Sequence, residues 1–262
     1  MMNLLLSEWL KTKRTPIRWL AFVTPVIFAA LIIWYFSYQK VTTDTPFSIF
    51  RAFFEGWTAL VIPIGAGLIS GFIIHQEEMA GSFNGFLGSK LPRKDLYLGK
   101  LTMLILLTSA STLLSTLVLV EGLGYIANIH VPWIIFLLGA IMTIIGTIPI
   151  VAICLWMSFA WGLGASMGIG GGGLLIAALM ITPLGDNIWQ FVPWALPARL
   201  SALPGYYLHY LPGMQFPPSV ISSGYVIYET IKGLISSAAF FVIMLVGGLL
   251  WFNKWEGRKF YD

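Results

Sequence analysis

The chain has 262 residues, of which 58% are hydrophobic and 10% are charged, and its mean hydropathy is +0.84. A soluble domain carries about a quarter charged residues, so this composition excludes an ordinary soluble fold. The net charge of +4 does not predict nucleic-acid binding, because basic residues in a membrane protein mostly record its topology.

Six apolar runs are long enough, or nearly so, to cross a bilayer, which needs about 20 apolar residues per helix. The alternating polarity of a transmembrane β-strand is missing, and only helices and closed barrels satisfy their backbone in lipid. The sequence therefore predicts an all-α polytopic membrane protein in which residues 1–262 form one transmembrane domain. The predicted spans cover residues 17–38, 55–75, 101–120, 132–161, 174–191 and 224–252.

Residues 1–16 precede the first span. They combine leucine and tryptophan with the acid Glu8 and the bases Lys11, Lys13 and Arg14, a pattern typical of a helix that lies in the membrane interface. Pro16 lets the chain turn toward the first span. We therefore expect an interfacial helix at 1–16.

The segments between the later spans carry glycine and proline signals. The fourth span is long enough to tilt or to break at Pro149. The glycine-rich stretch 162–173 contains G-x-G-x-x-G, which indicates nucleotide binding only between a strand and a helix, so we expect a turn between spans there. Six prolines in 193–222 exclude a regular span, and we expect two short, partly buried helices that form an outer cap or re-entrant element.

Residues 76–100 form a polar segment between the second and third spans. Met79, Phe83, Phe86 and Leu87 recur at helical spacing, which predicts a short helix with an apolar ridge that ends at Pro92. Either a partner protein or lipid head groups would cover this ridge. Acids before the ridge and bases after it would set the register of a docked partner, and these are Glu77, Glu78, Arg93 and Lys94.

The distribution of basic residues predicts the orientation. Most of them lie before the first span, in the segment 76–100 and in the C-terminal tail, which fall on one side of a six-span layout. The positive-inside rule places both termini and the segment 76–100 in the cytoplasm. The expected location is the cell membrane.

The other polar residues do not indicate a metal, cofactor or ATPase site. Glu229 and Lys232 stand at i, i+3 and predict an ion pair, which is either a polar station on a substrate path or a pair at the membrane edge. Glu55 is open to the same two interpretations. The three histidines lack metal-ligand spacing and no P-loop motif is present, so we expect no metal, cofactor or ATPase site in this chain.

The chain resembles the permease subunits of type-2 ABC exporters. The likeness rests on the opening SEWLKTKRTPIRW, the loop QEEMAGSFNGFLGSKLPRKDLYLGK and the proline-rich hairpin before the last span. In that superfamily a similar loop forms the coupling helix that seats in a cleft of the ATPase. The resemblance implies this role for Glu77 or Glu78, Gly81, Leu87, Pro92, Arg93 and Lys100.

Within the superfamily, the opening, the length and the aromatic-rich spans resemble lantibiotic-protection permeases, which expel a producer's own peptide antibiotic from its membrane. The resemblance implies two copies of an ATPase that binds ATP and Mg, a second, related permease, and a cationic amphipathic peptide that enters from the lipid. ATP would shift the docked loops and rearrange spans one, two and five. The expected path residues are Glu55, Trp189, Trp194, Glu229 and Lys232.

Three alternatives remain open from the sequence. The cargo of such an exporter could be another antibiotic, a lipid or a glycan precursor. The chain could instead be a membrane scaffold or sensor subunit that transports nothing. An intramembrane enzyme is a third interpretation, and it has no evident nucleophile and base behind it.

Overall fold

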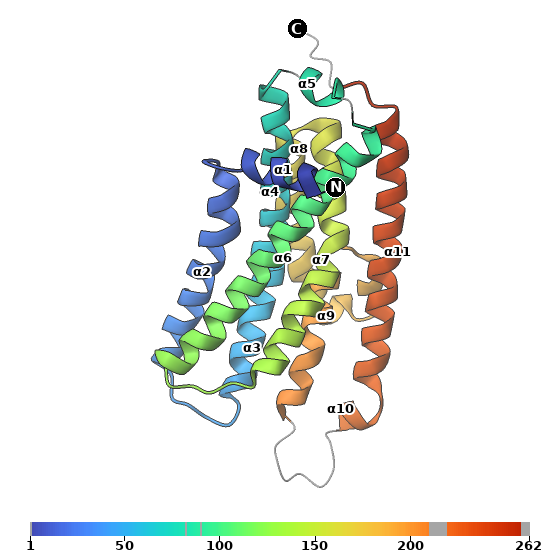
Figure 1. Cartoon of the computed structure of the whole chain (residues 1–262). Coiled ribbons are helices and arrows are strands. Elements are labelled where there is room, and N and C mark those ends of the chain that lie inside the picture. The colour runs from blue at the N-terminus through green and yellow to red at the C-terminus, as the bar shows by residue number, and fades with distance from the viewer. Residues whose placement is uncertain (1, 82, 90, 210–218, 258–262) are drawn as a thin grey trace.

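The computed structural model describes residues 2–81, 83–89, 91–209 and 219–257, and within these ranges its regular structure is entirely helical. Among these described residues, six helices are long and apolar enough to cross a membrane. They stand side by side as a bundle, with α1 lying across one end (Figure 1). The predicted all-α fold with six spans is therefore confirmed.

The first half of the described chain holds three long helices. Helix α1 (Met2–Lys11) precedes α2 (Pro16–Ser37). Helices α3 (Thr45–Gly56) and α4 (Ile62–Met79) are joined by a π-helical turn, η1 (Trp57–Val61), into one continuous helix. A single turn, α5 (Asn84–Leu87), then precedes α6 (Arg93–Tyr125).

The second half holds three long helices and a folded segment. Helix α7 (Trp133–Trp161) is followed by α8 (Leu163–Ile181). The folded segment comprises η2 (Pro183–Gly185), η3 (Trp189–Phe191), α9 (Ala195–Ala202) and η4 (Leu203–His209). The short α10 (Ser219–Ser222) leads into α11 (Tyr225–Asn253).

The second and third spans are longer than predicted. The second begins at Thr45 rather than at residue 55, because the aromatic segment 47–54 is itself helical and buries Phe50, Phe53 and Phe54. These rings pack against one another and against Phe136 of α7, which fixes the segment in the bundle. The third span begins at Arg93 rather than at residue 101, so the connection between the two is shorter than the predicted 76–100.

The predicted turn at 162–173 is wrong. Gly162 alone separates α7 from α8, and the remaining glycines of the stretch lie inside α8. Their use is close packing of helices: a Cβ atom at Gly170 would lie 2.6 Å from the carbonyl oxygen of Pro63 in α4. Helix α7 continues through Pro149 without a break, and α8 ends at Ile181 rather than at residue 191.

The segment after α8 folds between the long helices. Helix α9 is buried along α7, where a Cβ atom at Gly146 would lie 2.6 Å from Cα of Pro197. Helices α9 and η4 both lie within the predicted cap segment 193–222. Helix α9 lies inside the bundle rather than at the end of the bundle (Figure 1). Residues 210–218 of the predicted cap lie outside the described residues.

Candidate functional site

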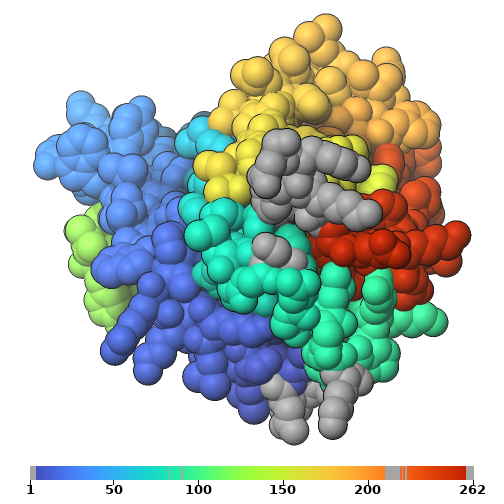
Figure 2. Space-filling view, turned by 90° about the horizontal axis from the view of Figure 1, so that it is seen from above, coloured from blue at the N-terminus to red at the C-terminus, as the bar shows by residue number. Residues whose placement is uncertain are grey.

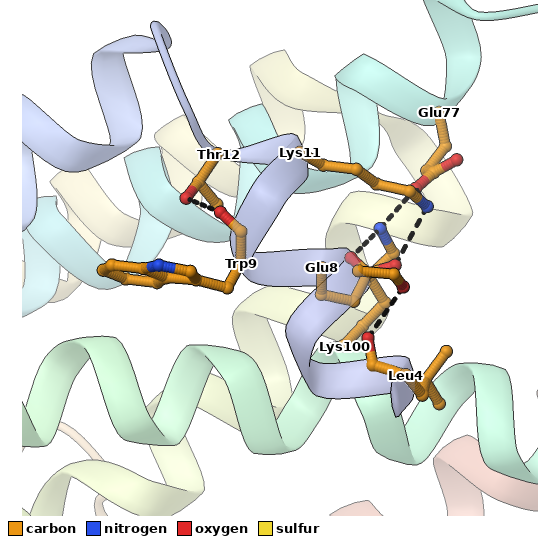
Figure 3. Close-up of polar contacts among 8 residues, drawn as sticks. Leu4, Glu8, Trp9, Lys11, Thr12, Glu77 and Lys100 are labelled. Carbon is orange, nitrogen blue, oxygen red and sulfur yellow. Dashed lines mark hydrogen bonds and ion pairs between the residues drawn. The ribbon is translucent and has the colours of Figure 1, made fainter. Parts of the chain in front are cut away.

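Four charged side chains meet at the end of the bundle that carries α1, α5 and the C-terminal end of α11, which we call the terminal end (Figures 1 and 3). Lys11 Nζ lies 3.0 Å from Glu8 Oε1 and 2.7 Å from Glu77 Oε1. Lys100 Nζ donates to Glu8 Oε2 and to Glu77 Oε1. Acids and bases therefore alternate around a closed ring of contacts, which we call the ion cluster.

Each member of the ion cluster comes from the end of a helix. Glu8 and Lys11 are one turn apart on α1, Glu77 is in the last turn of α4, and Lys100 is two turns into α6. Gly99 lets α1 approach α6, because a Cβ atom there would lie 2.6 Å from Cδ2 of Leu4. The cluster therefore ties three elements that are far apart in the sequence.

Three of the four charges are buried, with Lys100 1%, Glu8 4% and Glu77 8% exposed. A buried charge is tolerated only when it is paired and hydrogen-bonded. Here each of the three buried side chains contacts two side chains of opposite charge. Burial by itself would lower the pKa of Lys11, but its hydrogen bond to Glu77 and the negative charges of Glu8 and Glu77 raise that pKa above its ordinary value. Lys11 therefore stays positively charged and holds the ring closed at neutral pH.

The predicted apolar ridge of α5 faces the interior of the chain. Phe83 and Phe86 are 1% and 7% exposed. The ring of Phe83 lies edge-on to Trp255, with centroids 5.0 Å apart, and Phe86 stacks near Phe159 of α7. The expectation that a partner protein or lipid head groups cover this ridge is corrected for both phenylalanines, because aromatic side chains at the end of α7, at the end of α11 and just after α11 cover them.

The backbone of the segment is held in a tight turn. Phe83 has φ 67°, in the left-handed region that non-glycine residues rarely adopt, and Gly81 has φ 124°. Arg93 donates to the carbonyl oxygens of Trp255 and Asn253, which ties the start of α6 to the end of α11. The segment is therefore anchored on both sides to other helices of the bundle.

The exposed surface of the segment differs from the predicted coupling surface. Of the predicted coupling residues, Glu77 and Lys100 are buried in the ion cluster, whereas Glu78 is half-buried and lies 3.1 Å from Nδ1 of His75. Leu87 and Arg93 are half-buried. The face seen from beyond the terminal end (Figure 2) presents α5 between α1 and the end of α11, and the exposed residues there are Met79, Ala80, Gly81, Asn84, Gly85, Gly88, Leu91, Pro92 and Lys94.

A second group of charges lies in the other half of the bundle. Lys232 Nζ lies 3.1 Å from both carboxylate oxygens of Glu229, as the spacing predicts, and Arg199 Nη2 lies 2.8 Å from Asp186 Oδ1. Both pairs border a cavity of 750 Å³, which we call the polar cavity. Its lining is Asp186, Asn187, Gln190, Arg199, Tyr206, Tyr225, Tyr228, Glu229 and Lys232.

The predicted path residues do not form one lining. Glu55 pairs with Arg51 at 2.7 Å and borders a neighbouring cavity of 290 Å³, which shares Arg199 and Tyr206 with the polar cavity. Trp189 is 3% exposed and its ring lies 5.1 Å from Lys232 Nζ, so it supports the polar cavity from behind. Trp194 packs against Gly173 of α8. Only Glu229 and Lys232 of the predicted path therefore line the polar cavity.

The sequence pattern does not predict several members of these two sites. Glu8 and Lys11 were expected only to face the membrane interface, and the contact of Glu8 with Lys100 joins residues 92 positions apart. The pairing of Asp186 with Arg199 was also not expected. One usable signal was present: Glu8 is the single acid in an otherwise basic opening segment, and an isolated acid there calls for a basic partner.

Two kinds of catalytic site, a metal centre and a serine nucleophile elbow, are not seen among the described residues. Within the described ranges, no three His, Cys, Asp or Glu side chains are grouped as metal ligands would be. Gly164, Ser166 and Gly168 spell G-x-S-x-G, but they lie inside α8, and the buried Ser166 hydroxyl donates to the carbonyl oxygen of Gly67 at 2.8 Å. The Ser166 hydroxyl therefore joins two packed helices. It does not lie in the strand-to-helix turn that a nucleophile elbow needs.

The chain matches a known protein family over its first two thirds. The family described as "ABC-2 family transporter protein" matches residues 4–169, which is more than half of the chain. The matched region contains all four members of the ion cluster and the α5 segment. No match was found among curated proteins or among solved structures.

Proposed function

We propose an export function for this chain, which belongs to the ABC-2 transporter family and is therefore the multi-pass permease of an ABC transporter that associates with an ABC ATPase. The proposed cargo is an amphipathic antimicrobial peptide, such as a lantibiotic, which the permease exports from the membrane of its producer. The family membership carries the permease role. The peptide cargo rests on the resemblance of the opening segment and the layout to lantibiotic-protection permeases.

The proposed contact with the ATPase is the exposed face of the α5 segment. That face lies at the terminal end, where the concentration of basic residues favours the cytoplasm. It exposes backbone at Gly81 and Gly85, and the nearby Pro92 and Lys94 are also exposed. A cleft of the ATPase would receive this face, and the buried Phe83 and Phe86 would support it from inside.

The single observation that carries the coupling role is the anchoring of this segment to the rest of the bundle. Through Phe83, Phe86 and Arg93 it contacts α7 and α11, and through the ion cluster the neighbouring ends of α4 and α6 are tied to α1. A displacement of α5 would therefore move α1, α4, α6, α7 and α11 together. This differs from the expectation that spans one, two and five rearrange, because the contacts of the segment lead chiefly to other helices.

The other subunits of the transporter and the path of the peptide are also part of the proposal. Two ATPase subunits would bind ATP and Mg, since this chain has no P-loop motif of its own. A second, related permease would complete the pair, and the peptide would enter sideways from the lipid. Glu55, Glu229 and Lys232 border cavities in the half away from the proposed cytoplasmic face, and they are the path residues that the geometry favours.

The test is survival of a sensitive host that expresses the chain with a candidate ATPase, measured against a panel of lantibiotics, other antibiotics and detergents. We expect protection against lantibiotics only when both proteins are present. Lys94→Glu should abolish protection and ATPase copurification, whereas Lys13→Glu, an exposed lysine between α1 and α2, should preserve both. Protection by the chain without an ATPase, or unchanged protection with Lys94→Glu, would overturn the proposal.

A further inference from the structure

The polar cavity combines charges in a way that suits a small zwitterion. Two acids and two bases line it, so their formal charges cancel. A polycation would call for a net negative lining, and a polyanion for a net positive one. A ligand that carries one positive and one negative group matches this lining better than either.

Hydrogen-bonding capacity is left over on both kinds of group. An arginine has five N–H donors. Arg199 uses Nε for Met180 and Nη2 for Thr182 and Asp186, which leaves the donors on Nη1 without a partner in the described ranges. The side-chain oxygen of Gln190 is buried and has no donor among the described residues. The cavity therefore offers donors to an anion, and rotation of the Gln190 side chain, which lines the cavity, would present its unpaired oxygen to an N–H group.

The aromatic rings of the site narrow the choice of cation. Quaternary ammonium groups are usually held against the faces of aromatic rings. Here Lys232 Nζ already lies 5.1 Å from the Trp189 ring centroid and 5.9 Å from that of Tyr228. A primary ammonium, which donates hydrogen bonds to Gln190 and to the carboxylates, suits the site better than a choline group.

The surroundings of the cavity indicate that the zwitterion is attached to a lipid. Helix α11 exposes Ile227, Ile231 and Ile235, and the last two follow the cavity residues Tyr228 and Lys232 at i, i+3. These side chains form an apolar strip on a helix that is long and apolar enough to span a membrane. Acyl chains can lie along this strip while the head group occupies the polar cavity.

We propose that the polar cavity binds the phosphoethanolamine head group of a membrane phospholipid. The phosphate accepts hydrogen bonds from Arg199 and Lys232, and the ammonium donates to Glu229, Asp186 and Gln190. Glu229 and Lys232 also belong to the proposed peptide path, so peptide and lipid would compete for the cavity, but lipid binding itself requires neither the peptide nor the ATPase. It lies in the half of the bundle away from the ion cluster, so its occupancy is measurable on the permease alone.

The experiment is native mass spectrometry of the purified full-length chain, exchanged into equal mixtures of phosphatidylethanolamine, phosphatidylcholine and phosphatidylglycerol. We expect the first lipid to be retained about tenfold more than either of the others, the discrimination that one hydrogen bond to a charged group provides. Equal retention of the three lipids, or preference for phosphatidylglycerol, would overturn the proposal.

Three variants locate the effect. Glu229→Gln combined with Lys232→Gln removes one ion pair without leaving an unpaired charge, and should abolish the preference. Gln190→Leu keeps every charge and should remove only the discrimination between ethanolamine and choline lipids, so it tests the site even where the double variant fails to fold. Lys13→Gln, an exposed lysine that does not line the polar cavity, should change nothing.

Two competitors distinguish the source of the head group. Soluble phosphoethanolamine, added at the concentration of the lipid, should not displace bound phosphatidylethanolamine, because it lacks the acyl chains that lie along α11. Displacement by it would refute the lipid assignment. A cationic amphipathic peptide that displaces the lipid at equal concentration, and binds more tightly, would assign the cavity to the peptide and overturn the proposal.

Discussion

The ion cluster and the polar cavity contain the same charges, two acids and two bases, but they use them differently. In the ion cluster the contacts join three elements, and Lys100 is 1% exposed. In the polar cavity Glu229 pairs with Lys232 one turn away on α11, and 58% of the Asp186 side chain is exposed beside a space of 750 Å³. Pairing between distant elements fixes their positions, whereas pairing within one segment leaves room and hydrogen-bonding capacity for a ligand.

The largest effect expected from this contrast is on stability. Lys100→Met leaves Glu8 and Glu77 buried beside a single lysine, and breaking such a buried pair costs about 3–5 kcal/mol. The thermal unfolding temperature in detergent should fall sharply. Asp186→Asn should cost about 1 kcal/mol or less, because 58% of its side chain is exposed and Arg199 keeps its bonds to Met180 and Thr182. Equal losses in the two variants would remove the distinction between the sites.

A smaller effect is expected from the packing that seats α1. Gly99→Val places a side chain against Leu4 and should cost about 1–3 kcal/mol, the usual range for overpacking. The same change at Gly124, which has open space around its Cα, should be close to neutral apart from helix propensity. Protease cleavage near residue 12 measures the release of α1, and unchanged cleavage in Gly99→Val would show that this contact does not hold it.

Sequence reasoning reached the architecture but not the two sites, for physical reasons. Apolar runs of membrane length mark the spans, since composition alone determines whether a helix can sit in lipid. The stretch 162–173 was misjudged because glycine weakens a helix in water, whereas in α8 it allows the close approach of α4. Phe83 and Phe86 were assigned to an outward ridge because helical periodicity identifies an apolar face without identifying what covers it.

Only some of the ion pairs in the two charged sites are predictable from the sequence, for a related reason. The pair Glu229 and Lys232 lies within one helical turn, so its spacing predicts the contact that the structure shows. The contacts of Glu8 with Lys100 and of Lys11 with Glu77 depend on how three helix ends meet, which a single sequence does not encode in any local pattern. Local pairs are predictable from one sequence, and the pairs that hold distant elements are not.

The smallest effect expected is the pH dependence of the ion cluster. Lys11 has a pKa raised above the ordinary lysine value of 10.5, so its contribution to stability is complete below that pH and is lost as the pH rises through the raised pKa. The difference in unfolding temperature between the native chain and Lys11→Met should therefore be constant from about pH 6 to 9 and shrink above about pH 10.5. A difference that shrinks below pH 9 would mean that the ring does not hold Lys11 charged.

The central claim is that the terminal end is the face that meets the ATPase in the cytoplasm. It is tested most directly by labelling single cysteines with a membrane-impermeant maleimide, in a chain whose only native cysteine, the buried Cys154, is replaced by alanine. We predict that Lys94→Cys is labelled only in opened cells and is protected when the ATPase is present, whereas Lys40→Cys, at the opposite end, is labelled in intact cells. Labelling of Lys94→Cys in intact cells would contradict the account.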